Sequence, residues 1–279
     1  MSYKVSAICM KVMIVAGFLL LLQPAFSQSG FQALDETFKQ NQKLLGNNIA
    51  ALVWKGDTIV YKKEMGDFNT KTAAPIASAS KWLTAALVMM FVEEGKISLD
   101  DKITKWIPEY AKYGKNYITI RICLTNMTGI QQDESLITRL LDRKKYASLE
   151  EMVNAFAAKE IQTNPGTEFR YGDIGFDIAG RVLEVVSKKR FDLLIRQKLL
   201  VPLGMRRTTF SDMEGGAVNP ATGAQSTAED YIKFLAMLLH KGKFGGKQIL
   251  SEESVNQLAE VMVTPDKIKY APKLAQGYS

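Results

Sequence analysis

The feature that most limits the fold of this 279-residue chain is an apolar stretch in its first third. Eight consecutive apolar residues run from Ala85 to Val92, and Glu93-Glu94-Gly95 follows them. A helix over this stretch is apolar on every face, so it is stable only where other elements surround it. We therefore expect a buried central helix that begins near Ser80 and stops at Gly95.

The pattern around this stretch indicates one hairpin and many helices. Residues 31–45 carry apolar side chains at helical spacing, which predicts an amphipathic helix. Residues 49–54 and 58–65 are two β-rich runs on either side of a short turn, which is typical of a hairpin. Residues 97–225 show helical segments but little strand alternation. Ser226 with Glu229 predicts a capping box, and Ser251 predicts the cap of another helix.

The N-terminus is typical of an export signal. Lys4 and Lys11 precede an unbroken apolar run from Val12 to Leu22, and Ala25 and Ser27 are small residues at the two positions that a signal peptidase reads. The run is too short for a comfortable transmembrane helix, which needs about 20 residues. We expect a signal peptide over 1–27, a mature domain over 28–279 in the periplasm or medium, and no stable membrane insertion after cleavage. An uncleaved anchor is the alternative.

The small number of histidine and cysteine residues excludes several kinds of functional site. The chain has one histidine, His240, and two cysteines, Cys9 and Cys123. Signal cleavage removes Cys9, so the mature chain cannot form an intrachain disulfide. A His/Cys zinc cluster is excluded, and the proton carriers of an enzyme would be lysine, tyrosine or carboxylates. We therefore expect no metal and no organic cofactor.

The formal charge of +7 does not by itself indicate a nucleic-acid partner. The basic clusters are short, and many lysines stand beside acidic residues. Such a pattern is typical of a solvated surface, so we expect no nucleic-acid binding.

A serine–lysine pair is the strongest chemical candidate. Ser78 and Lys81 are three residues apart at the start of the apolar helix, where this spacing puts two side chains on the same face. A lysine that is desolvated by an apolar helix can serve as a base for a serine nucleophile. The spacing is common by chance, and its position beside the buried helix makes it informative. A helix-capping serine and a surface lysine are the structural alternatives.

Several segments, in order, resemble the serine β-lactamase and penicillin-binding-protein superfamily, closest to its class C and esterase-like branch. They are Pro75–Ala85, Gly95–Asp101, Ile118–Arg121, Leu124–Gly129, Pro165–Gly175, Pro202–Met205 and Ser226–Asp230. The resemblance runs from about residue 45 to about residue 262. It implies an α+β, β-lactamase/transpeptidase-like fold, with an antiparallel sheet flanked by helices and an all-helical subdomain.

The resemblance also implies roles for individual residues. Ser78 matches the acylated nucleophile and Lys81 its proton partner, while Tyr171 matches the tyrosine that opens the Y-x-N motif and shares the acid/base work. Asp173 stands where that motif has Asn, so a carboxylate replaces an amide that contacts the substrate's acyl group. We expect Asp173 to favour amine-bearing substrates and disfavour anionic β-lactams. Asn126 and Met127 also depart from the family pattern, and we expect these two to affect packing only.

The activity implied is that of an exported serine hydrolase that forms an acyl-enzyme with an amide or ester bond. Its partner would be a small-molecule or peptide substrate, and an esterase, a D-amino-acid peptidase and a β-lactamase all remain candidates. The alternative from another class is a non-catalytic periplasmic binding or scaffold protein on the same fold. The oligomeric state is not indicated.

The last family motif is the one that the sequence does not contain. In the family, a Lys/His-x-Gly strand after the final helices supplies a backbone N–H to the oxyanion hole. His240-Lys241-Gly242 has that shape, but it closes a helix in the pattern and is predicted to be a helix end. Tyr270–Ser279 resembles the lead into the missing strands. We therefore expect a domain that is incomplete at its C-terminus, with the C-terminal strands missing.

Overall fold

The computed structural model of the chain describes residues 28–131, 146–211 and 216–269. These residues belong to two units, one that ends at Ile49 and one that begins at Ala50. The predicted signal peptide over 1–27 and the segment Tyr270–Ser279 lie outside the described residues.

The first unit contains η1 (Gln28–Phe31) and α2 (Gln32–Asn41). The helix predicted over 31–45 therefore exists but ends earlier. Gly46 and Asn47 both have positive φ, and the Asn47 N–H donates to the Gln42 carbonyl at 2.8 Å. Glycine and asparagine are the residues that adopt this left-handed conformation most easily, which explains why the turns that follow Asn41 stop here.

The second unit is built around α3 (Ser80–Glu93), the helix predicted from the apolar stretch. Every residue from Leu83 to Phe91 is buried, including Thr84. Gly95 has φ +65°, and the Lys96 N–H behind it donates to the Phe91 carbonyl at 3.0 Å. This is a left-handed helix stop, so the central helix and its predicted end are both confirmed.

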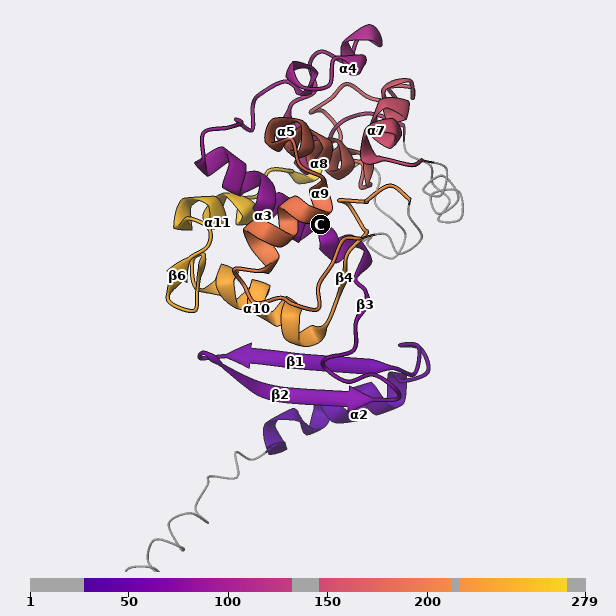
Figure 1. Cartoon of the computed structure of the whole chain (residues 1–279). Coiled ribbons are helices and arrows are strands. Elements are labelled where there is room, and N and C mark those ends of the chain that lie inside the picture. The colour runs from indigo at the N-terminus through magenta and orange to yellow at the C-terminus, as the bar shows by residue number, and fades with distance from the viewer. Residues whose placement is uncertain (1–27, 132–145, 212–215, 270–279) are drawn as a thin grey trace, which may run out of the picture. The chain divides into compact units, whose positions relative to one another are not determined.

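Besides α3, the second unit contains further helical segments. They are η2 (Ala77–Ala79), η3 (Ile103–Lys105), α4 (Glu109–Lys112), α5 (Ile120–Leu124), α7 (Leu149–Ala157), α8 (Ile174–Ser187), α9 (Phe191–Ile195), η4 (Arg196–Leu200), α10 (Ala228–Leu239), α11 (Glu252–Ala259) and η5 (Pro265–Lys267). Of these segments, α8 and α11 pack against α3 (Figure 1).

Helix α8 is the closest partner of the central helix. It packs against α3, α5 and α7, and Gly175 lets its first turn approach α5. A Cβ at Gly175 would lie 2.1 Å from the Cys123 carbonyl oxygen, so no larger residue fits without movement. This close approach fixes the start of α8, where two of the predicted site residues lie.

The strands form pairs. β1 (Ile49–Lys55) and β2 (Thr58–Met65) make the predicted hairpin, and Gly56 and Asp57 in its turn both have positive φ, as a type I′ turn requires. β3 (Ala74–Pro75) pairs antiparallel with β4 (Gln225–Ser226), and β5 (Lys243–Phe244) pairs with β6 (Lys247–Gln248). The predicted α+β class, with antiparallel pairing and a largely helical part, is confirmed.

The capping predictions have different outcomes. Ser251 caps α11 as predicted, because its Oγ accepts the Ser254 N–H at 3.1 Å. The box predicted at Ser226 is wrong by one residue. Thr227 is the N-cap of α10 and accepts the Asp230 N–H at 3.1 Å, while the Ser226 hydroxyl bonds to another side chain.

The segment His240-Lys241-Gly242 ends α10, as predicted. His240 is the C-cap, and Lys241 and Gly242 have φ of +53° and +85°. A Cβ at Gly242 would lie 1.8 Å from the Leu250 carbonyl oxygen. The segment therefore forms a tight turn into β5 and not a strand that faces Ser78.

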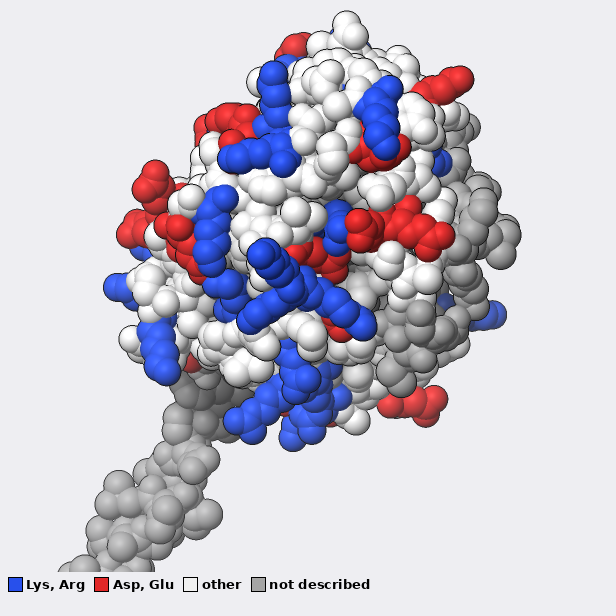
Figure 2. Space-filling model, turned by 45° about the horizontal axis from the view of Figure 1, so that its top comes forward, with Lys and Arg blue, Asp and Glu red and all other residues white. Residues whose placement is uncertain are grey.

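Charges of both signs cover the face shown in Figure 2, with lysine and arginine beside aspartate and glutamate. Arg121 binds Asp100 with two hydrogen bonds, and Glu94 pairs with Lys96 and Lys198. Because such pairs are exposed, each contributes little to stability. Within the described ranges, no helix is both long enough and apolar enough to cross a membrane.

Candidate active site

Two serines lie at the start of α3, and they differ in their exposure to solvent. β3 ends at Pro75, and Ala77 then has φ +44°, an uncommon conformation for a residue with a Cβ. This turn leaves Ser78 exposed and buries Ser80 completely. Ser80 donates to the Ala77 carbonyl at 2.6 Å and accepts the Ala224 N–H at 3.0 Å, so its hydroxyl has a structural task.

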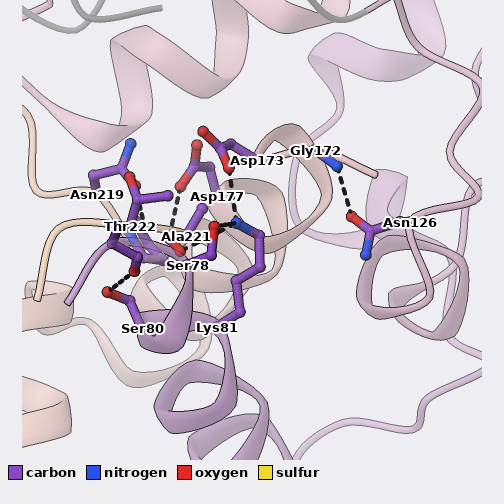
Figure 3. A network of polar contacts seen from close by, with 12 residues as sticks. Ser78, Ser80, Lys81, Asn126, Gly172, Asp173, Asp177, Asn219, Ala221 and Thr222 are labelled. Carbon is purple, nitrogen blue, oxygen red and sulfur yellow. Dashed lines mark hydrogen bonds and ion pairs between the residues drawn. The ribbon is translucent and has the colours of Figure 1, made fainter. Parts of the chain in front are cut away.

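Lys81 lies beneath Ser78, on the first turn of α3. Its Nζ is 3.4 Å from the Ser78 Oγ, 2.8 Å from an Asp173 carboxylate oxygen and 3.3 Å from the Ala221 carbonyl oxygen (Figure 3). Only 4% of the residue is exposed. A buried lysine is tolerated when its polar atoms are all bonded, and these three contacts meet that requirement.

Asp173 immediately precedes α8 and forms an ion pair with Lys81. Its side chain is 14% exposed, against 6% for the Lys81 side chain. The carboxylate thus points at the lysine (Figure 3). The structure thus brings Ser78 and Lys81 together with Asp173, which lies 92 residues after Lys81 in the sequence.

Tyr171 is close to this group, but its hydroxyl is not bonded to it. The Lys81 Nζ lies 5.1 Å from the centre of the Tyr171 ring, a cation–π distance. The residue is 49% exposed, and among the described residues its hydroxyl has no hydrogen-bond partner. Hydrogen bonds in a site without substrate are often long, so this geometry is compatible with a proton carrier that moves in when substrate binds.

Asn126 holds the segment that carries Tyr171. Its side-chain oxygen accepts the Gly172 N–H at 3.2 Å, and its carbonyl accepts the Arg170 N–H at 2.9 Å. Its φ is +56°, a conformation that asparagine tolerates better than most residues. The amide oxygen of Asn126 thus helps to hold the backbone beside Tyr171, and the expectation that Asn126 has no more than a packing role stays a prediction.

A cavity of about 490 Å³ opens beside Ser78 and Lys81. This size falls within the usual range for small-molecule sites, roughly 300–1,000 Å³. Most of the wall is apolar or aromatic, and Arg121, Gln257 and Glu260 add charged or polar groups to it. The wall includes Trp82, Leu124, Thr125, Asn126, Phe169, Tyr171, Phe176, Leu258 and Val261.

The sequence analysis missed one part of the site, the segment Asn219–Ala224, which we call the Pro220 turn. Its Ala221 carbonyl accepts from Lys81, and its Ala224 N–H donates to Ser80. Asn, Pro and Gly in this segment predict a turn. Nothing in the sequence indicates that the turn lies against the first turn of α3, since 140 residues separate Ala221 from Lys81.

Cys123 is buried, and its burial raises the pKa of the thiol. The thiolate is the reactive form of cysteine, so this residue is unsuited to act as a nucleophile, as expected. In the ranges that the structure covers, no group of three or more His, Cys, Asp or Glu side chains could hold a metal ion.

An exposed serine beside a buried lysine, at the start of a central helix in an α+β fold, defines a serine–lysine site of the β-lactamase type. The Beta-lactamase family model matches residues 32–269. The chain therefore belongs to the β-lactamase family, as the resemblance of its motifs predicts.

Three known proteins illustrate the likeness. A proposed beta-lactamase from Bacteroides dorei is 30% identical, with a TM-score of 0.72 over 84% of this chain and 72% of its own. The octameric penicillin-binding protein homologue from Pyrococcus abyssi is 24% identical, with a TM-score of 0.70 over 84% of this chain and 61% of its own. Protein Rv1367c of Mycobacterium tuberculosis is 24% identical over 79% of this chain and 69% of its own. The β-lactamase/transpeptidase-like fold is thereby confirmed.

Proposed function

We propose that this chain is a serine hydrolase in which Ser78 forms an acyl-enzyme with an amide or ester substrate. The observation that carries the proposal is the 3.4 Å distance between the Lys81 Nζ and the Ser78 Oγ, at the rim of a cavity of substrate size. A nucleophile within reach of a base that a third group orients is the arrangement that covalent catalysis requires. Membership of the β-lactamase family supports a serine hydrolase in general terms.

The chemical step assigns one task to each residue. Ser78 attacks the acyl carbon while its proton passes to Lys81, and the leaving group takes a proton through Lys81 or Tyr171. Water then attacks the acyl-enzyme and releases the acid. The family resemblance implies a second oxyanion donor from a Lys/His-x-Gly strand, and that donor stays a prediction.

Labelling by an active-site reagent separates this proposal from a non-catalytic binding protein. A fluorophosphonate and a labelled penicillin are incubated with the chain, with its Ser78→Ala variant and with denatured protein. We expect a mass increase on the peptide that contains Ser78, in the native wild-type chain alone. Native chain that takes up neither reagent would instead favour the binding or scaffold protein.

The substrate class follows from a panel of reporter substrates. Three candidates fit the chemistry, and they are a neutral ester, a peptide that ends in D-amino acids and a β-lactam. Initial rates for nitrophenyl acetate, a D-Ala-D-Ala peptide and nitrocefin, each normalised to the fraction of chain that the fluorophosphonate labels, rank the three classes. The Ser78→Ala variant supplies the background rate for each.

The proposal includes export. The basic and apolar pattern before Ser27 supports a signal peptide over 1–27, which leaves a mature domain that starts at residue 28 in the periplasm or medium. Expression of the whole chain followed by N-terminal sequencing tests this. A mature N-terminus at Gln28 is expected, and protein that keeps residues 1–27 would contradict cleavage.

A further inference from the structure

The Pro220 turn lies between the central helix and α8. The Thr84 hydroxyl of α3 donates to the Pro220 carbonyl at 2.7 Å. From the other side, Gly180 of α8 lies so close that a Cβ there would be 2.3 Å from the Pro220 Cγ. Inside the turn, the Asn219 Oδ1 accepts the Thr222 N–H at 2.7 Å (Figure 3). The turn is therefore held by hydrogen bonds and by packing on both sides.

Asp177 fixes the middle of this turn. Its Oδ1 accepts the Ala221 N–H at 3.0 Å, and the residue is only 1% exposed. Ala221 itself is fully buried. With its N–H bonded to Asp177, the same residue directs its carbonyl oxygen to the Lys81 Nζ at 3.3 Å (Figure 3). A charged acceptor makes a stronger hydrogen bond to an N–H than a neutral one does, so Asp177 is suited to hold this residue in place.

We propose that Asp177 is a positioning residue that acts through Ala221 to aim the Lys81 amine at Ser78, an inference that rests on the proposed function. To accept a proton, the amine nitrogen must point its lone pair at the Ser78 hydroxyl. A neutral amine has two N–H groups and one lone pair, so its two other contacts decide where the lone pair points.

Besides Ser78, the Lys81 amine contacts two groups, and both can only accept hydrogen bonds. An ionised carboxylate and a backbone carbonyl have no proton to donate, so Asp173 and Ala221 each take one N–H. The third direction of the nitrogen, which is the lone pair, is then left for Ser78. Removing the Ala221 contact frees one N–H to turn toward Ser78, and the amine loses its orientation as a base.

The first experiment compares variants of Asp177 with a matched buried aspartate. Asp230 is also buried on a helix, and its carboxylate accepts the Arg207 N–H at 2.7 Å, but it has no contact with Lys81 or the Pro220 turn. The variants are Asp177→Ala, Asp177→Asn and Asp230→Ala in the full chain. Acylation of Ser78 by an activated ester is followed at increasing ester concentration, and each rate is divided by the folded fraction.

The expected result is a loss in the rate constant and not in binding. Asp177→Ala lowers the saturating acylation rate about ten- to a hundredfold, because small misplacements of a catalytic group cost that much, and leaves the half-saturating concentration within about twofold. Asp177→Asn keeps the Oδ1 acceptor and recovers most of the rate. Asp230→Ala loses stability but keeps the rate per folded molecule.

A second pair of variants covers the case in which Asp177→Ala does not fold. Thr84→Val removes the hydroxyl that holds Pro220 and keeps the shape of the side chain, and we expect a three- to tenfold lower saturating rate. Thr208→Val removes a similarly buried hydroxyl away from the turn, where Thr208 bonds to Ser226, and is expected to leave the rate unchanged.

Two results would overturn the inference in distinguishable ways. If Asp177→Ala or Thr84→Val acylates at the wild-type rate per folded molecule, the Pro220 turn is only structural and the proposed function stands. If the native wild-type chain is never acylated at Ser78, the proposed function fails and the inference fails with it.

Discussion

We expect the replacement of each of the two serines before Lys81 to have opposite effects on activity and stability. Ser78 is exposed and has Lys81 as its polar partner at 3.4 Å. Ser80 is fully buried, and its hydroxyl satisfies both the Ala77 carbonyl and the Ala224 N–H. Ser78→Ala should therefore abolish turnover and leave stability unchanged, whereas Ser80→Ala should lower stability and retain the nucleophile.

The magnitude for Ser80→Ala follows from the groups that it leaves unpaired. The buried Ala224 N–H loses its acceptor, which costs about 1–3 kcal/mol. The carbonyl of the exposed Ala77 can bond to water instead, so it adds little. At about 2–4 °C per kcal/mol for a chain of this size, the melting temperature should fall by roughly 2–12 °C. Ser78→Ala should stay within about 0.5 kcal/mol of the wild type, as exposed substitutions usually do.

Two measurements on each variant test this division. Urea unfolding gives the free energy of unfolding, and fluorophosphonate labelling below the transition gives the rate of serine modification per folded molecule. We expect a rate loss on the order of a thousandfold or more for Ser78→Ala, as for other members of a catalytic unit. The reasoning is refuted if Ser80→Ala abolishes labelling in folded protein while Ser78→Ala is still labelled.

Four further predictions concern single side chains. Tyr171→Phe should lower the rate about a hundredfold or more in kinetic assays and leave the melting temperature unchanged, because the hydroxyl is exposed and unbonded. Asp173→Asn should raise the rate on penicillins relative to neutral esters, and an unchanged ratio would contradict the charge argument. Hydrogen bonds from the Thr70 backbone N–H and from Lys62 lower the pKa of Glu64 from 4.5 to about 2, so this stabilisation is complete above pH 4.5 and is lost as the pH falls toward 2. Glu64→Gln should then lower the urea midpoint at pH 7 but not at pH 2. Cys123 should react with iodoacetamide only in unfolded protein, as measured by mass, because burial raises the pKa of its thiol.

The parts of the fold that could be predicted depend on local chemistry. The apolar stretch required a buried helix, and Gly95 supplied the left-handed residue that ends it. The hairpin was predictable because Gly56 and Asp57 tolerate the positive φ of its turn. The cap of α10 was placed one residue early because Ser226 and Thr227 are both residues that can cap a helix. What distinguishes them is that the Thr208 hydroxyl bonds to Ser226, a contact from outside the helix.

The parts of the site that could not be predicted depend on contacts between distant segments. The spacing of Ser78 and Lys81 indicated a shared face of a helix, and both lie together at its entrance. The role of the Pro220 turn could not be predicted from the sequence, because its contact with Lys81 is made by a backbone carbonyl. A carbonyl is present at every position of a chain, so no residue type marks the one that completes a site.

The ion pair of Lys81 with Asp173 links the departure from the family motif to substrate choice. While Lys81 carries a proton, its charge offsets the carboxylate 2.8 Å away, and an anionic substrate meets a nearly neutral pair. To act as a base, Lys81 must be neutral, and the pair of side chains then carries the net negative charge of the carboxylate beside the acyl group. We therefore expect an anionic substrate to be repelled in the one state that can react, and a neutral or amine-bearing substrate not to be. The substitution of Asn by Asp at this position should consequently act on the acylation rate more than on binding.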